Sequence, residues 1–495
     1  MSFNSFIKHY REQLRELFRG EGGINEISLE RGLPDEVYEK IMDCNPLQVW
    51  VPEEYGGLGG NTGEAMSMLE ASGYESLALS LMMGINGALF IQPVVNYAEE
   101  ETRKEVLDRF MNDRCTGGLM ITEPDYGSDA LQMQTACSYD EEQNAYHVKG
   151  TKHWAGLTGM ADYWLITARE EQGNGNGLSR DIDIFIHDSR RGGIDVKEYY
   201  KNLGLYMLPY GRNEIDITVP ESYKLKPKSI GIKMMLDILH RSRLQFPGMG
   251  IGYMKRLLDE AVQHCKERFV GGKKLLDYDQ VKRRISGLQM SFTVCSALCA
   301  YTSKNIPLSK DVSNMSLEAN AIKTVTTDLM QEAAQSVLQL MGAKGYRLDH
   351  IAGRSVIDSR PFQIFEGSND ILYQQITESV LKQMRKLKVK NLSEYLSDYE
   401  LTHRSADRLD DLLDFEVDHT LVQRKMVDLG RAISRIISMD FTIRLGEKGF
   451  NQELISNALK AQKQRIETLL ATFKSPDTAE VVEHYEENSK WIRFV

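Results

Sequence analysis

The hydrophobic pattern of this 495-residue chain changes twice, and this change limits the folds it can adopt more than any other feature. Apolar residues first recur at the 3.6-residue period of helices, as Phe6, Tyr10 and Leu14 do. Short β-rich runs then replace that period, and the helical period later returns. The pattern predicts a mainly α protein with a central, mostly antiparallel β domain. The predicted parts are an N-terminal helical domain (1–115), a middle β domain (116–228), a C-terminal helical domain (229–388) and an additional helical region (389–495).

Charge and cysteine content exclude several classes of protein. Sixty basic and seventy-one acidic side chains give a net charge of −11, which argues against a nucleic-acid-binding protein. An anionic ligand would therefore need a local basic patch. Six cysteines without a CxxC pair are too few for a disulfide scaffold. Cys295 and Cys299 lie four residues apart in a helical pattern and are predicted to be small buried residues, so no metal site is expected.

No uninterrupted run of 18 apolar residues is present, so no transmembrane segment is expected. The first residues carry Glu12 and Glu16 on an amphipathic helical pattern, which is not typical of a secretory signal. The expected location is cytoplasmic.

Two segments of the β domain have the composition of ligand-binding loops. In residues 117–130 a β-rich run leads into a Gly/Ser/Asp loop, whose backbone N–H groups could hold anionic or carbonyl oxygens. In residues 150–164, Trp154 stands beside Ala155 and Gly156 and could lay its indole on a flat ligand. The alternatives are an ordinary turn for the first segment and a buried Trp next to a turn for the second.

A third region concentrates positive charge in an otherwise acidic chain. Its basic residues suit a phosphate group, and the alternative is a set of solvated helix ends. They are Arg241, Arg243, Arg268, Lys273 and Lys274.

The fourth segment contains Glu366, which follows Pro361 and the apolar run 362–365. Ser368 is predicted to be the N-cap of the next helix. Burial of a carboxylate in an apolar loop is costly and raises its pKa toward the range useful for a general base. The alternative is a turn glutamate near a helix cap.

Taken together, these segments resemble the acyl-CoA dehydrogenase family over roughly residues 30–388. The stretches that carry the resemblance, in chain order, are MITEPDYGSD, GTKHWAG, RLQFPGMGIG, ERFVGGKKLLDYDQ, QLMGAKGY and IFEGSND. Each is short, but their order and spacing in an α–β–α setting are specific. The resemblance implies an N-terminal helical domain, a middle β domain and a C-terminal four-helix domain.

The resemblance also implies a reaction. FAD would be the cofactor and an acyl-CoA thioester the substrate, with Glu366 removing the α proton and flavin N5 accepting the β hydride. A thioester α-CH is a very weak acid, so donors aimed at the thioester oxygen must stabilise the enolate. Electrons would pass to an electron-transfer flavoprotein. The alternatives are an acyl-CoA oxidase using O₂, a dehydrogenase acting on a carrier-protein thioester, a flavin oxygenase, and a non-enzymatic scaffold.

Further site residues follow from the family's motifs. Because FAD straddles subunits in this family, a homodimer or homotetramer is implied. The cofactor-binding positions are Leu119, Met120, Ile121, Thr122, Gly127, Ser128, Trp154, Ala155, Gly156, Ser368 and Asp370, with Arg268, Gln280, Gln339 and Gly342 contacting the FAD of a neighbouring subunit. The substrate positions are Ser128, His240, Arg243 and Gly367.

The chain also departs from the family pattern. Gly156 stands where a Thr or Ser hydroxyl usually bonds flavin N5, and acyl-CoA oxidases often have Gly there. The FVGGKK stretch after Arg268 is one residue longer than usual, and His240 replaces a frequent Asp. Residues 390–495 have no counterpart in shorter members, so they could cover a dimer face, replace the second dimer of a tetramer, or contact a partner.

Overall fold

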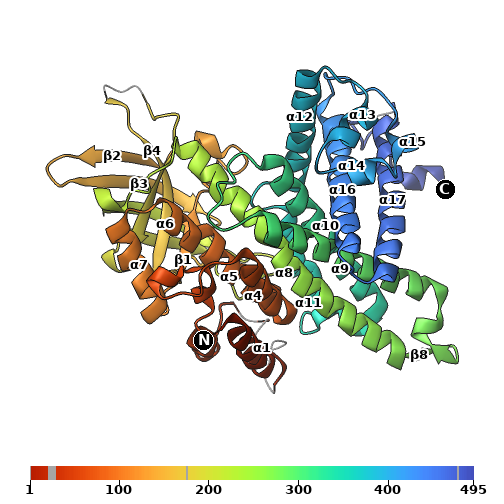
Figure 1. The fold of residues 1–495 in the computed structure, drawn as a ribbon, viewed down its shortest axis with the longest axis horizontal. Coiled ribbons are helices and arrows are strands. Elements are labelled where there is room, and N and C mark those ends of the chain that lie inside the picture. The colour runs from red at the N-terminus through yellow and green to blue at the C-terminus, as the bar shows by residue number, and fades with distance from the viewer. Residues whose placement is uncertain (1, 21–28, 30, 174–176, 477–478) are drawn as a thin grey trace.

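The predicted succession of α, β, α and additional α segments is confirmed by the computed structural model, which describes residues 2–20, 29, 31–173, 177–476 and 479–495. The β domain lies at one end of the molecule, and the last helices lie at the other end (Figure 1). The long helices of residues 231–387 cross the middle of the molecule between them.

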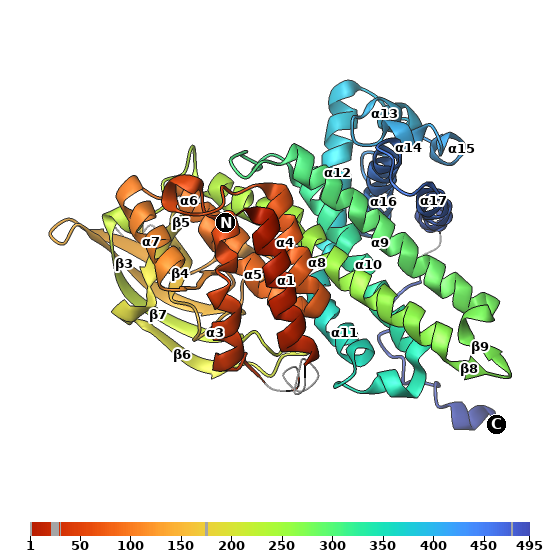
Figure 2. The ribbon, with the colours of Figure 1, turned by 60° about the horizontal axis from the view of Figure 1, so that its bottom comes forward.

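The N-terminal helices pack between the sheet and the long helices (Figure 2). One continuous helical stretch, Leu77–Tyr97, is long and apolar enough to span a membrane by length and composition, which the sequence analysis did not foresee. Because 89% of its apolar window is buried inside the fold, it has the environment of a core helix. The elements are α1 (Phe3–Arg19), α3 (Asp35–Asp43), α4 (Thr62–Glu75), α5 (Leu77–Gly84), a π-helix (Ile85–Ile91), α6 (Gln92–Tyr97) and α7 (Glu100–Asn112).

The β domain is mostly antiparallel, as predicted, although β1 and β2 both run parallel to β4. Strand order is β1-β4-β2-β3-β7-β6, with β5 paired to β4. A loop joins antiparallel β4 and β5, and its residues 174–176 lie outside the described residues. The strands are β1 (Gly117–Met120), β2 (Ala136–Asp140), β3 (Ala145–His153), β4 (Tyr163–Glu170), β5 (Asp183–Asp188), β6 (Ile194–Tyr199) and β7 (Gly211–Pro220).

The sequence analysis did not identify β2 or β6, because their surface-facing residues leave little of the apolar alternation that marks a strand.

Long helices form the C-terminal domain. Helix α8 has 37 residues and is therefore about 56 Å long. Helix α10 ends at Gly342, whose φ of +63° favours glycine. The helices are α8 (Gly231–Glu267), α9 (Asp279–Asn305), α10 (Ser316–Met341), α11 (Ile351–Ser359) and α12 (Asn369–Leu387).

A short hairpin joins α8 to α9 and accounts for the extra residue in FVGGKK. Its strands are β8 (Phe269–Val270) and β9 (Lys273–Lys274), and the two-residue turn places Gly271 and Gly272 at positive φ. Such two-residue turns favour glycine because both positions need positive φ.

The additional region folds back on the C-terminal domain. Helices α16 and α17 lie against α9, and α16 also packs on α10 and α12 (Figure 2). The helices of this region are α13 (Leu392–Asp398), α14 (His403–Ala406), α15 (Asp410–Leu413), α16 (Gln423–Glu447) and α17 (Gln452–Lys474). Short 3-10 helices elsewhere are Pro46–Trp50, Glu53–Tyr55, Ala130–Gln132, Ser189–Arg191, Glu221–Tyr223, Leu275–Asp277, Gly342–Tyr346, Arg360–Gln363 and Trp491–Phe494.

Candidate active site

Glu366 lies in the connection between the 3-10 turn Arg360–Gln363 and α12, in a strained backbone conformation. Its φ is +54°, which is uncommon for a residue with a side chain. The neighbouring rings hold this connection in place: Phe362 packs on Phe246 of α8 and on Phe365, at centroid distances of 5.6 and 4.9 Å. Strained backbone of this kind persists where surrounding packing enforces it, often at functional sites.

Glu366 is only partly exposed, and one of its two carboxylate oxygens is buried without a hydrogen-bond partner. Ser242 Oγ donates to Oε1 at 2.8 Å, whereas Oε2 is buried without a hydrogen-bond partner. Burial raises the pKa of the Glu366 carboxyl above its ordinary value, and the Ser242 hydrogen bond and the Arg243 charge partly oppose this rise. The pKa thus rises as the sequence led us to expect, but the surroundings are not purely apolar, because Ser242, Arg243 and Lys323 all act on this carboxylate.

Arg243 and Lys323 hold two consecutive backbone carbonyls, those of Glu366 and Gly367. Arg243 Nε donates to the Glu366 carbonyl at 2.9 Å, and Lys323 Nζ donates to the Gly367 carbonyl, also at 2.9 Å. Burial lowers the pKa of Lys323 to about 7, although the Glu366 charge acts in the opposite direction. The sequence analysis missed Lys323. A lysine close to residues that are buried in α10, such as Val325, could have indicated a buried and therefore functional ammonium group.

Ser368 occupies the N-cap position of α12 that the sequence predicts, but it does not make the hydrogen bond of a capping residue. Asn369 supplies the polar contacts at this helix start instead, because its Oδ1 accepts from Lys323 and its Nδ2 donates to Asp328.

A buried ion pair joins the two ligand-binding segments of the β domain. Lys152, in the 150–164 segment, is fully buried and places Nζ 2.9 Å from Glu123 Oε1, in the 117–130 segment. The same ammonium donates to the Ile121 carbonyl at 3.1 Å. Burial lowers the pKa of Lys152 to about 8. The backbone N–H of His153 also donates to the Thr122 carbonyl, so the two segments form one platform.

Trp154 presents its indole on the surface of this platform. Its side chain is 51% exposed and its φ is +57°, so the alternative of a buried Trp is wrong. The Tyr200 ring supports it from one side, at a centroid distance of 4.5 Å. A large aromatic face held in a strained conformation and left open is suited to stacking on a planar ligand.

The space that a side chain at position 156 would need is occupied by Ile85. A Cβ at this position would lie 2.8 Å from Ile85 Cδ1, at the start of the π-helix, and 3.5 Å from Tyr210 Cε1. Any larger residue at 156 would therefore require Ile85 to move.

Tyr210 links the platform to the carboxylate. Its ring centroid lies 6.3 Å from that of Trp154. Burial raises the pKa of the Tyr210 phenol, and the nearby negative charge of Glu366 raises it further. The fold thus brings Trp154, Gly156 and Glu366 into one neighbourhood from segments more than 200 residues apart in the chain. No sequence motif pointed to Tyr210.

The remaining platform residues differ in accessibility. Leu119, Met120, Ile121 and Thr122 follow from β1 into the loop, and Met120 is fully buried. Gly127 and Ser128 are exposed on that loop, whereas Ala155 is buried beneath Trp154.

The predicted basic cluster does not form. Arg241 is buried against Asp237 at 3.1 Å, and Arg243 contacts the Glu366 loop, so both side chains are engaged within α8 and its neighbours. Arg268 follows 25 residues later, about 38 Å along the same helix, beside Lys273 and Lys274. His240 is likewise engaged: Nδ1 contacts the Val312 carbonyl at 2.9 Å, and burial lowers its pKa to about 4.

The positions matched to a neighbouring subunit's FAD gather at one end of the helical domain. Arg268, Gln280, Gln339 and Gly342 are all exposed, at the ends of α8, α9 and α10. They lie far from Glu366 of the same chain. Asp370, by contrast, is near Glu366, and its Oδ1 lies 2.7 Å from Arg431 Nη2 of the additional region.

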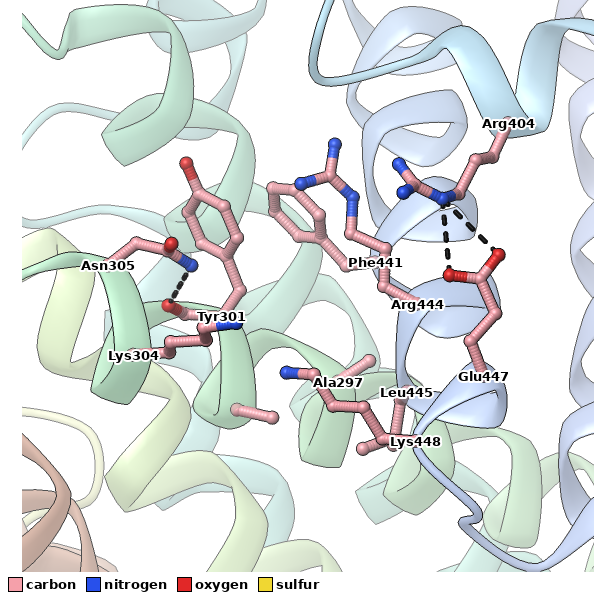
Figure 3. Close-up of a pocket in the computed structure, with 11 residues that line it drawn as sticks. Ala297, Tyr301, Lys304, Asn305, Arg404, Phe441, Arg444, Leu445, Glu447 and Lys448 are labelled. Atoms are coloured by element: carbon pink, nitrogen blue, oxygen red, sulfur yellow. Dashed lines mark hydrogen bonds and ion pairs between the residues drawn. The ribbon is translucent and has the colours of Figure 1, made fainter.

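Two pockets lie where the additional region meets the C-terminal domain. A cavity of about 1090 Å³ between α9, α10, α12, α16 and α17 is lined by Arg283, Arg284, Arg431, Arg435 and Arg465. A smaller pocket of about 280 Å³ has Tyr301 and Phe441 in its wall, with Arg404 paired to Glu447 (Figure 3). Neither is lined by Glu366 or Trp154. Among the described residues, no group of three or more His, Cys, Asp or Glu side chains could hold a metal ion.

Comparisons with known proteins agree with this arrangement. Three family models match along the chain: the acyl-CoA dehydrogenase N-terminal domain at residues 7–114, the middle domain at 118–217 and the C-terminal domain at 230–381.

Individual relatives and solved structures have low sequence identity to this chain. The very long-chain specific acyl-CoA dehydrogenase of Mus musculus is 23% identical over 341 residues, 68% of this chain and 52% of that protein. The chain therefore matches about half the length of this relative. Glutaryl-CoA dehydrogenase of Desulfococcus multivorans is 27% identical over 65% of this chain and 82% of its own. An acyl-CoA dehydrogenase complexed with FAD from Bacillus anthracis shares the fold, with a TM-score of 0.77 and 17% identity over 95% of this chain and 87% of that one.

The three domain models together span most of the chain, in the order and at the places where the platform and Glu366 occur. This chain belongs to the acyl-CoA dehydrogenase family.

Proposed function

We propose that this protein is an FAD-dependent acyl-CoA dehydrogenase that converts an acyl-CoA thioester to the trans-2-enoyl-CoA, with Glu366 as general base. The observation that carries the proposal is the Glu366 carboxylate, with one oxygen buried and unpartnered and a raised pKa. A base of this kind binds a proton more readily than an exposed glutamate does, as removal of an α proton requires. Membership of the acyl-CoA dehydrogenase family supports the same assignment.

The residues present fit FAD. The exposed Trp154 indole offers a face for a flat ring, and the adjoining loop exposes Gly127 and Ser128 beside it. When bound there, FAD would supply the acceptor for the hydride leaving the β carbon. The chain's own groups would hold the thioester against Glu366, exclude water and take the α proton.

The wider assembly is part of the proposal. Arg268 lies about 38 Å along α8 from Arg243, and the other matched positions lie exposed at the ends of α9 and α10. This separation supports a homodimer or homotetramer in which those positions contact the FAD of a neighbouring subunit. An electron-transfer flavoprotein is the proposed electron acceptor, and the cytoplasm is the proposed location.

An acyl-CoA oxidase is the second candidate. Gly156 has no hydroxyl that could bond flavin N5, and in this respect the chain resembles the oxidases, which often have Gly at this position. Ile85 fills the space that a side chain at position 156 would need. A carrier-protein thioester remains the alternative substrate.

Anaerobic titration of the purified flavoprotein with a panel of acyl thioesters tests the proposal. Acyl-CoA should bleach the flavin band near about 450 nm. Slow reoxidation on admitting air would favour a dehydrogenase, and fast reoxidation with peroxide release would favour an oxidase. If no acyl thioester bleached the flavin, the proposed reaction would be wrong.

Glu366→Gln should lower the rate of bleaching by roughly 10²-fold or more while FAD stays bound, because the amide cannot accept the α proton. Glu378→Gln, the same change at an exposed position of α12, is the matched control. Equal rates for the two variants would show that another residue is the base.

A further inference from the structure

Three buried polar side chains next to the proposed active site form a chain of hydrogen bonds. Trp50 Nε1 donates to Gln245 Oε1 at 3.1 Å, and Gln245 Nε2 donates to Gln92 Oε1 at 2.9 Å. Their exposed fractions are 1% for Trp50 and 2% for each glutamine. We call this chain the Trp50–Gln245–Gln92 relay.

The relay has a fixed direction. An indole N–H can only donate, so Gln245 must turn its oxygen toward Trp50. Its NH₂ group then faces Gln92, which must in turn present its oxygen to Gln245. The NH₂ group of Gln92 is consequently forced to the far end of the relay, and Nε2 is buried there without a hydrogen-bond partner. A buried donor left unpaired costs free energy, so the fold holds it for an acceptor that the chain does not supply.

The relay borders both halves of the proposed active site. Gln245 lies one helical turn beyond Ser242, which donates to the Glu366 carboxylate. Gln92 directly follows the π-helix Ile85–Ile91, whose first residue packs where a side chain at Gly156 would stand. π-Helical turns of this kind are frequent at functional sites. We place the acyl chain of the substrate along α8 beside this helix, with its α carbon at Glu366 and its far end toward Gln92.

Resting on the proposed function, we infer that Gln92 determines substrate specificity by donating a hydrogen bond to an oxygen on the distal part of the acyl chain. The substrate class is then an acyl thioester that carries a hydroxyl or keto oxygen beyond the reacting carbons. The relay consists of neutral groups, so it does not compensate a buried carboxylate, and the acceptor is a neutral oxygen.

The test compares short acyl-CoA thioesters of equal length with and without a distal keto or hydroxyl group, using wild type and Gln92→Met. Wild type should favour the oxygenated thioesters by about tenfold or more in kcat/KM, because the unsubstituted chain leaves the donor unpaired. Gln92→Met should lose that preference, and Gln452→Met, at an exposed position of α17, should keep it. Binding of the corresponding enoyl products, followed by the shift of the flavin spectrum, should show the same ratios.

A second variant tests the direction of the relay without altering Gln92. Trp50→Phe removes the fixed donor, so both amides can turn and Gln92 can offer its oxygen instead. That oxygen accepts from a hydroxyl but repels a keto oxygen, so the preference for keto substrates should fall while that for hydroxyl substrates stays. FAD content and thermal unfolding report whether the variant folds, and Gln92→Met tests the inference independently if it does not.

The outcomes separate this inference from the proposed function. If unsubstituted chains reduce the flavin as well as the oxygenated ones, or Gln92→Met leaves their ratio unchanged, the inference is wrong although the dehydrogenase assignment stands. A buried water would then satisfy Gln92. If no acyl thioester reduces the flavin, the proposed function itself fails.

Discussion

At the scale of single residues, the site combines two side chains in backbone conformations that such residues rarely adopt. Glu366 and Trp154 both have positive φ, +54° and +57°. Each is held there by its neighbours: Arg243 binds the Glu366 carbonyl, and the Trp154 N–H donates to the Gly211 carbonyl. The strain is local to these two residues, as is frequent where the surrounding structure fixes functional side chains.

Ser242→Ala should raise the pKa of Glu366 further, because the lost hydrogen bond favours the carboxylate over the acid. The base works only when deprotonated, so the acid limb of kcat/KM against pH should move to higher pH. A hydrogen bond to a charged group contributes about 1.5–3 kcal/mol, which corresponds to about one to two pH units. Activity lost near neutral pH should therefore return on raising the pH.

A pH–rate series for Ser242→Ala, with Ser456→Ala as a control at an exposed position of α17, checks this expectation. An acid limb that stays in place or moves to lower pH would contradict the role given to Ser242.

At the scale of elements, the β domain holds its two loop segments together through the interior. The Lys152–Glu123 ion pair connects the last part of β3 to the loop after β1, and Glu123 also accepts from the Thr135 N–H before β2. Although burial pushes the pKa of Glu123 upward, the Lys152 charge and these hydrogen bonds hold it below its usual value. The carboxylate thus stays charged and keeps the platform under Trp154 in one geometry.

Lys152→Met should destabilise the protein by about 3–5 kcal/mol, because it leaves the buried Glu123 carboxylate without its counter-charge. Lys149→Met, on the same strand, breaks an exposed pair with Asp216 and should change the free energy of unfolding little, because solvent screens the pair. Urea unfolding of both variants measures the difference, and flavin retention should fall for Lys152→Met alone. Equal stability losses would mean that the buried pair does not secure the platform.

At the scale of the whole molecule, the additional region is an integral layer of the fold. Its helix α16 packs on three helices of the C-terminal domain, and the Tyr301 and Phe441 rings stack across this boundary at 3.9 Å and 12° (Figure 3). Arg431 of the same helix reaches Asp370 at the start of α12, four residues after Glu366. The region therefore supports the helix that carries the proposed base.

Phe441→Ala should lower the free energy of unfolding by about 3–5 kcal/mol, because a fully buried ring leaves a cavity at the boundary. Cleavage of the 390–475 segment by a protease should become faster than in wild type. Phe494→Ala removes a ring that is 77% exposed and serves as the control. If both variants matched wild type in urea midpoint and cleavage rate, the additional region would not be anchored by this contact.

The sequence alone determined the order of α and β segments and identified Trp154 and Glu366 as candidate site residues, because these depend on local periodicity and short motifs. Only the tertiary structure decided which distant groups meet. It separated Arg243 from Arg268 by most of a 37-residue helix, and it brought Tyr210 and Lys323 to Glu366. It also lined up Trp50, Gln245 and Gln92 so that one buried donor lacks a partner. Such contacts depend on how elements far apart in the chain pack together, and this packing leaves no periodic trace in the sequence.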